Sequence, residues 1–159
     1  MTVKIVCAVV IVVSCSYVGI KMSNFMRMRV KALTEMLAAV GHIESFISTV
    51  RMPLDEIYNT LSETKGNVGR FFTGLSPGES WRKRLDELPG LLPQDKEMLA
   101  EFSEKLGSFS SERQLDELKL SKTRLAAALT QAKTDMNENS RIYRSMSFFA
   151  GVVIAILLI

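Results

Sequence analysis

The stretch FMRMRVKALTEMLAAVGHIESFISTV (Phe25–Val50) decides the fold, because its apolar residues recur in steps of three and four. These residues are Met26, Val30, Leu33, Leu37, Val40 and Ile47. Others widen the stripe on the adjacent face, namely Phe25, Met36, Ile43, Phe46 and Val50. Glu44 is the one interruption. The spacing predicts a long helix with a stripe that faces the core.

A second long helix is predicted near the end of the chain, where the same rhythm recurs. Its apolar positions are Leu115, Leu118, Leu125, Leu129, Ala132 and Met136, and Lys122 fills the one missing step. Two long helices with such stripes can pack against each other as an antiparallel pair. No stretch of the chain alternates like a strand, so the predicted fold class is all-α.

Shorter helices are predicted between Pro53 and Gly107. They correspond to PLDEIYNTL (residues 53–61), ESWRKRLDEL (79–88) and QDKEMLAEFSEKLG (94–107). Pro53 suits a first-turn position, and Gly107 suits a helix cap. Glycine and proline separate the helices at 66–69, 74–78 and 88–93. One helical domain of this size can bury a core of its own.

Two apolar segments enclose this domain. IVCAVVIVVSCSYVGI (Ile5–Ile20) carries no charge, and its flanks extend it to the length of a membrane helix. The chain closes on RIYRSMSFFAGVVIAILLI (Arg141–Ile159), whose apolar part is close to the minimum for a span. We therefore predict an N-terminal transmembrane helix at 1–22, a helical domain at 23–144 and a C-terminal transmembrane segment at 145–159.

Basic residues lie on the domain side of both apolar segments. They are Lys21, Arg27, Arg29 and Lys31 after the first segment, and Arg141 and Arg144 before the second. Lys4 alone precedes the first segment, and nothing charged follows the second. The positive-inside rule then predicts a cytosolic central domain with both termini across the membrane. Attraction to anionic lipid headgroups explains these charges more simply than binding to nucleic acid does.

A lipoprotein signal is the alternative interpretation of the first segment. VVSC (Val12–Cys15) resembles a lipoprotein cleavage box, and processing there would lipidate Cys15 and make the domain extracytoplasmic. Against it, the apolar run continues as far as Ile20, where a lipidated protein would have a polar tether. Because Cys7 and Cys15 both lie in this segment, no disulfide framework or cysteine metal site is predicted.

The motifs of catalysis and cofactor binding are absent from the sequence. His42 is the only histidine, which excludes a histidine-based triad and a HExxH metal site, and it suits a packed or half-exposed helical residue better than a ligand. Neither a GxxxxGK[ST] loop nor a GxGxxG loop occurs. The chain is therefore predicted to be no enzyme and to use no cofactor or metal.

An acidic surface is the remaining candidate site. Glu97, Glu101 and Glu104 fall on one helical face at i, i+4 and i+7. One interpretation is a solvated outer face. The other is a docking face for a basic cytosolic partner, placed as far from the membrane as the domain reaches. Trp81 and the pair Phe71–Phe72 are interpreted as core anchors of the short helices rather than as part of an interface.

Three stretches of the chain carry a family resemblance. The closing segment Arg141–Ile159 follows a basic-Tyr-Arg-Ser-(apolar)-Gly-apolar pattern. LTEMLAAVGHIESFISTVRMPLDEI (33–57) has a long apolar helix that leads into Pro53-Leu54, and LGSFSSERQLDELKL (106–120) has an LG pair, a glutamine and Leu-Lys-Leu. Together they are similar to the stage III sporulation protein AB family of endospore-forming bacteria, over essentially the whole chain.

This resemblance implies a non-enzymatic membrane component of the channel complex between mother cell and forespore. It also implies a likeness to the inner-membrane platform proteins of type II secretion and type IV pilus machines, which engage a cytosolic ring ATPase. The partner would then be the stage III sporulation protein AA ATPase, together with other components of the complex. The implied location is the outer forespore membrane on the mother-cell side, with the central domain in the cytosol. The oligomeric state stays open, including a homo-oligomer.

Overall fold

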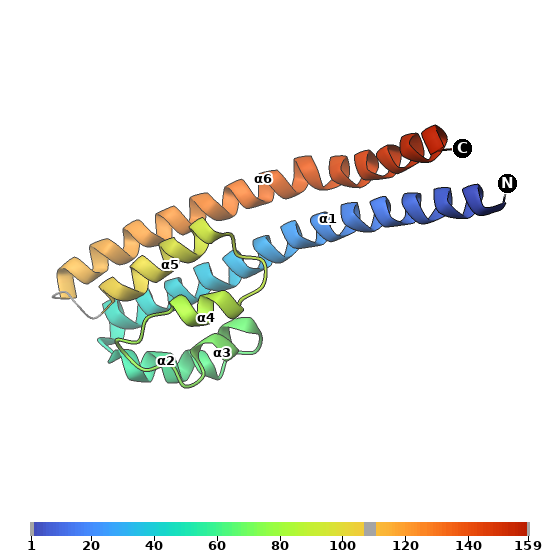
Figure 1. Ribbon diagram of the computed structural model, residues 1–159. Coiled ribbons are helices and arrows are strands. Elements are labelled where there is room, and N and C mark those ends of the chain that lie inside the picture. The colour runs from blue at the N-terminus through green and yellow to red at the C-terminus, as the bar shows by residue number, and fades with distance from the viewer. Residues whose placement is uncertain (1, 107–110, 159) are drawn as a thin grey trace. The chain divides into compact units, whose positions relative to one another are not determined.

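The computed structural model describes residues 2–106 and 111–158 (Figure 1). Its elements are α1 (Thr2–Ser45), the π-helical turn η1 (Phe46–Val50), α2 (Leu54–Ser62), α3 (Asn67–Phe72), α4 (Arg82–Glu87), α5 (Pro93–Lys105) and α6 (Ser111–Leu158). No strand occurs among the described residues, which confirms the predicted all-α class. The capping position predicted for Gly107 lies outside the described residues.

The chain divides into two compact units. Unit 1 comprises Met1–Arg27 and Ala132–Ile159, and unit 2 comprises Met28–Gln131. Within unit 1, the first part of α1 and the last part of α6 run antiparallel (Figure 1). Helix α6 continues without a break through residues 144 and 145, where the predicted soluble and membrane parts of the chain meet.

The α1 stripe in unit 2 is centred slightly differently from the predicted one. Its buried residues are Ala32, Leu33, Met36, Ala39, Val40 and Ile43. Val30 and Leu37 are only half-buried, whereas Met36 and Ile43, predicted on the widening face, are fully covered. On α6 the predicted positions Leu118, Leu125, Leu129 and Ala132 are buried, Met136 is half-buried, and the side chain of Leu115 lies outside the described set.

The polar interruptions of the two stripes contact each other. Lys122 Nζ donates to Glu44 Oε2 at 2.7 Å, across 78 residues of sequence. The Glu44 side chain is only 18% exposed, so Lys122 supplies a partner for a carboxylate that is largely removed from water. An ion pair at one step of two apolar stripes favours a single antiparallel register.

Short helices α2 to α5 complete unit 2 beside α1 (Figure 1). The predicted segment 79–88 contains α4, and the predicted segments 53–61 and 94–107 match α2 and α5 to within one or two residues at each end. Pro53 immediately precedes α2 instead of lying in its first turn. Helix α3 was not predicted, because Gly66 and Gly69 were interpreted as breaks. A Cβ on Gly69 would lie only 1.8 Å from the carbonyl oxygen of Thr64, so this short helix needs glycine there.

An aromatic cluster forms the core of the short helices. Its rings belong to Tyr58, Phe71, Phe72, Trp81 and Phe102, all of which are buried. Trp81 is 1% exposed, and its ring centroid lies 5.4 Å from that of Phe72 and 5.5 Å from that of Phe102, both in edge-on arrangements that favour aromatic pairs. The interpretation of Trp81 and Phe71–Phe72 as core anchors is therefore confirmed.

One of the described helices is long and apolar enough to cross a membrane. It is the helix over Val9–Val50, whose apolar window lies near the N-terminus. Most of the large side chains in its first part are exposed, for example Val10, Val13 and Val18. Length, composition and exposure together fit a helix that lies in lipid rather than in a protein core.

Candidate functional site

Helix α5 positions the predicted acidic residues on one exposed face. The helix begins at Pro93, a residue well suited to the first position because it lacks the N–H that would otherwise have no partner. Leu99, Ala100 and Phe102 face the core. The opposite side presents Glu97, Glu101 and Glu104 to solvent, as their spacing predicted.

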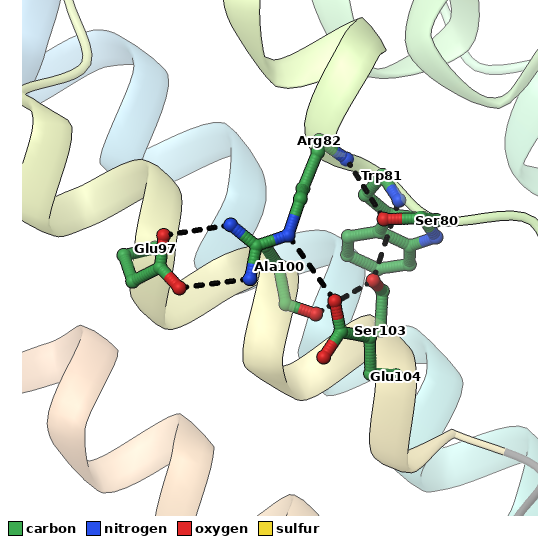
Figure 2. A network of polar contacts seen from close by, with 7 residues as sticks. All are labelled: Ser80, Trp81, Arg82, Glu97, Ala100, Ser103 and Glu104. Carbon is green, nitrogen blue, oxygen red and sulfur yellow. Dashed lines mark hydrogen bonds and ion pairs between the residues drawn. The ribbon is translucent and has the colours of Figure 1, made fainter.

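Arg82 of α4 binds two of these three glutamates (Figure 2). Its Nη1 and Nη2 donate to the two carboxylate oxygens of Glu97 at 2.9 and 2.8 Å, and its Nε donates to Glu104 Oε1 at 3.2 Å. The bidentate geometry is the stronger form of such a pair. Because both carboxylates are about half exposed, the pairs stabilise the fold only weakly.

These pairs change the electrostatics of the face. The hydrogen bonds from Arg82 and its positive charge lower the pKa of Glu97 below its ordinary value, and the same contacts raise the pKa of Arg82. Three carboxylates and one guanidinium leave a net charge of about −2 on the face. Glu101 makes no ion pair with another described residue, so it is the acid best placed to meet a basic partner.

Sequence reasoning missed Arg82, because it lies 15 residues from Glu97 on a different helix. The backbone N–H groups nearby are held by serine hydroxyls: that of Trp81 donates to Ser103 Oγ at 3.3 Å, and that of Arg82 donates to Ser80 Oγ at 3.4 Å (Figure 2). The start of α4 is thus fixed against α5, which positions Arg82 over the acidic face.

A buried ion pair joins α5 to α1. Arg29 Nε donates to Asp95 Oδ2 at 2.9 Å and Arg29 Nη2 to Asp95 Oδ1 at 3.1 Å, with the side chains 9% and 2% exposed. Asp95 Oδ2 also accepts the backbone N–H of Leu92 at 3.1 Å, which satisfies a free donor at the start of α5. A buried carboxylate with several donors is the arrangement that compensates desolvation.

This pair corrects one interpretation from the sequence. Arg29 was grouped with the basic residues near lipid headgroups, but it is buried against Asp95. Its place four residues before Leu33, on the core stripe, was the available signal. Helix α5 begins beside Arg29, and the acidic face extends from there toward the end of the helix at Lys105.

An open groove of about 650 Å³ lies between α3 and α4. It is lined by Asn67, Arg70, Phe71, Arg84, Glu87, Leu88 and Pro89. Arg84 donates to the carbonyl oxygens of Phe71, Thr73 and Gly74 at 2.6 to 3.0 Å, so it terminates α3 rather than serving a ligand.

His42 is exposed on α1 and stacks on Phe46 with 6.4 Å between ring centroids, so it is not packed in the core. Among the described residues, no group of three histidine, cysteine, aspartate or glutamate side chains could hold a metal ion.

The fold and its surface define an all-helical protein with one apolar helix of membrane length. The family model of stage III sporulation protein AB matches residues 4–159, so the chain belongs to that family. A relative, stage III sporulation protein AB of Bacillus subtilis (strain 168), is 26% identical over 168 aligned residues, which cover 98% of each chain. No solved structure gives a significant match. The resemblance found in the sequence is thus confirmed.

Proposed function

We propose that this protein is a non-enzymatic membrane component of the channel complex between mother cell and forespore. In this role it acts as a platform, similar to those of type II secretion, that docks a cytosolic secretion-type ATPase. The partner is the stage III sporulation protein AA ATPase. Family membership and the apolar N-terminal helix support the proposal.

The proposed division of the chain is a membrane helix at 1–22, a cytosolic domain at 23–144 and a second membrane segment at 145–159. Large apolar side chains point outward on both ends of the chain, which suits lipid contact. They include Val6, Val9, Val10, Val13, Tyr17 and Val18 on α1, and Met146, Phe148, Phe149, Val153, Ile154 and Ile156 on α6. Lys21 Nζ lies 5.5 Å from the ring centroid of Tyr17, a pairing suited to the headgroup region.

The location that follows is the outer forespore membrane on the mother-cell side. A topology experiment in non-sporulating cells that express the chain in the plasma membrane tests on which side the domain lies, with Ser76→Cys as the only cysteine after Cys7 and Cys15 are replaced by alanine. Ser76 is exposed, so an impermeant thiol reagent can reach it once it has access. We expect labelling only after lysis. Labelling in intact cells would contradict the cytosolic domain and favour a lipidated extracytoplasmic protein.

The observation that carries the docking proposal is the exposed acidic face of α5, with Glu101 at its centre. A carboxylate without an ion pair on a rigid helix can pair with a basic group of a partner, and such charges steer association. Glu97 and Glu104 are already bound by Arg82, so they hold the face in shape and keep it acidic.

Co-purification of the AA ATPase with the full chain in detergent tests this face. We expect Glu101→Lys to reduce the recovered ATPase strongly, because it reverses the central charge without breaking a described ion pair. Glu63→Lys at the end of α2 is the matched control, since Glu63 is also an exposed glutamate. Equal recovery of the ATPase with both variants would contradict the acidic-face proposal. The platform proposal is tested by the wild-type chain, and failure of the ATPase to co-purify with it would contradict that proposal.

A further inference from the structure

In unit 1, α1 and α6 approach each other so closely at two positions that only glycine fits there without displacing a neighbour. A Cβ on Gly19 would lie 2.8 Å from both Cβ and Oγ of Ser147. A Cβ on Gly151 would lie 3.0 Å from Cys15 Cβ and 3.1 Å from Val12 Cα. Both glycines are buried, so any larger residue would push the helices apart.

A hydrogen bond between the same two helices lies further along the contact. The hydroxyl groups of Ser23 and Ser140 are 3.0 Å apart, and Ser23 is 2% exposed. This contact and the two glycine contacts pair residues in one antiparallel order along the helices. The interface is therefore a continuous line of contacts and not a single crossing point.

Small residues recur on the contacting faces with a spacing of four. On α1 they are Cys15, Gly19 and Ser23, and on α6 they are Ser147, Gly151 and Ala155. Four residues are about one helical turn, so each set lies on one side of its helix. The large apolar residues of unit 1 point outward instead, which is the reverse of the arrangement in a soluble helical bundle.

This arrangement suits helix association in lipid. Lipid chains are as apolar as leucine, so membrane helices associate through close van der Waals contact at small residues and through hydrogen bonds between helices. The predicted C-terminal segment, residues 145–159, is shorter than the roughly 17–25 residues of an independent span. Contact with a neighbouring helix would stabilise the inserted segment, which is too short to be stable in the membrane by itself.

We propose that the C-terminal segment enters the membrane as a partner of the α1 span, through the Gly19–Ser147 and Gly151–Cys15 contacts. The two segments form one helical hairpin and are not independent spans. This inference rests on the two membrane segments of the proposed function, but it does not depend on the ATPase.

Disulfide trapping tests the contact in isolated membranes. Gly151→Cys in a Cys7→Ala chain places a thiol against the native Cys15, with the two Cβ atoms about half an ångström closer than the ~3.5 Å lower limit of a disulfide. Mild oxidation with copper phenanthroline should then protect both thiols from a maleimide reagent in the monomer band. Ala150→Cys, on an exposed neighbouring position, should stay reactive. Equal protection, or none in either variant, would overturn the proposed contact.

A second variant tests whether the contact is needed for insertion. A cysteine added after Ile159, in a chain without Cys7 and Cys15, reports whether the C-terminus crosses the membrane. In intact non-sporulating cells that express the chain in the plasma membrane, we expect Gly19→Leu to abolish its labelling, whereas Val18→Leu, on an exposed position, should not. Full labelling with Gly19→Leu would mean that the segment spans alone, and the hairpin proposal would fall.

The two proposals fail separately. If the ATPase does not co-purify while the Cys15–Gly151→Cys disulfide forms, docking is wrong and the hairpin stands. If the ATPase co-purifies and the disulfide does not form, only the hairpin is wrong. Retention of the Gly19→Leu chain in membranes washed with alkaline carbonate verifies that the first span is still inserted.

Discussion

Helices α1 and α6 contact each other in both units, but with opposite kinds of residue. In unit 2 their buried positions are large, such as Leu33, Ile43 and Leu125, and in unit 1 they are small, such as Gly19 and Gly151. In water, removal of apolar area stabilises by ~25 cal/mol per Å², so large residues stabilise most. In lipid that driving force is missing, and close approach takes its place. The difference between the units is thus the one expected if unit 1 forms the proposed membrane segments and unit 2 the proposed cytosolic domain.

The aromatic core offers the largest test of this comparison. Phe72→Ala removes a ring that is 1% exposed, and it should lower the free energy of unfolding by about 4 kcal/mol. Urea titration of the full chain in detergent micelles measures it through the fluorescence of Trp81, the only tryptophan. Phe149→Ala, at a position 64% exposed in unit 1, is the control and should leave the midpoint unchanged. Equal effects would break the contrast between the units.

The buried ion pair of unit 2 gives the next largest effect. Asp95→Ala leaves the Arg29 guanidinium buried without its carboxylate and should cost about 3 kcal/mol in the same titration. The double variant Arg29→Met with Asp95→Leu should regain most of the loss, because apolar residues can replace such a pair. A double variant as unstable as the single one would show that the charges themselves are required.

Gly90 tests close approach within unit 2, where large side chains otherwise dominate. Its φ is +95°, and a Cβ there would lie 2.8 Å from the carbonyl carbon of Met28. Gly90→Ala should therefore destabilise by about 2 kcal/mol, from the backbone and the overlap together. Gly78→Ala separates the two causes, since Gly78 has a φ of +86° but no atom within 4 Å of its Cβ position. Gly78→Ala should lower the free energy of unfolding by about 1 kcal/mol, from the backbone alone. If Gly90→Ala costs no more than Gly78→Ala, overlap with Met28 does not contribute.

Periodicity predicted the long helices and their meeting faces, because apolar spacing follows directly from helix geometry. It even marked Glu44 and Lys122 as exceptions in their stripes, and these two residues form a pair. It did not find partners that lie far apart in sequence, such as Arg29 and Asp95, because a charge on an apolar face carries no sign of its partner. It also did not predict α3, because a segment with several glycines is typical of a turn.

The small-residue interface of unit 1 escaped sequence reasoning for a related reason. A search for apolar stripes looks for large apolar residues, and Gly19, Ser23 and Gly151 contribute little to such a pattern because their side chains are small or polar. Their spacing of four is visible only when small residues are considered as the contact rather than as gaps. The sequence placed Glu97, Glu101 and Glu104 on one face of α5, but it did not predict Arg82, which binds Glu97 and Glu104 from another helix.

The exposed ion pair of Arg82 and Glu97 gives the smallest effect, and it sharpens the contrast with the buried pair of Arg29 and Asp95. Arg82→Gln removes the hydrogen bonds and the charge that lower the pKa of Glu97, so this pKa should rise toward its ordinary value of 4.5. A carboxyl pH titration of Glu97 by NMR, in the full chain in micelles, measures the rise.

The sign of the effect on stability follows from the lowered pKa. Because the folded state holds the Glu97 proton less tightly than the unfolded state, the pair stabilises at neutral pH. This contribution should fade as the pH drops from about 4.5 through the folded-state pKa, so wild type and Arg82→Gln should converge in urea midpoint there. Since both side chains are about half exposed, added salt should also narrow the gap. A difference that persists at low pH and high salt would mean that Arg82 acts through contact with the helix surface and not through charge.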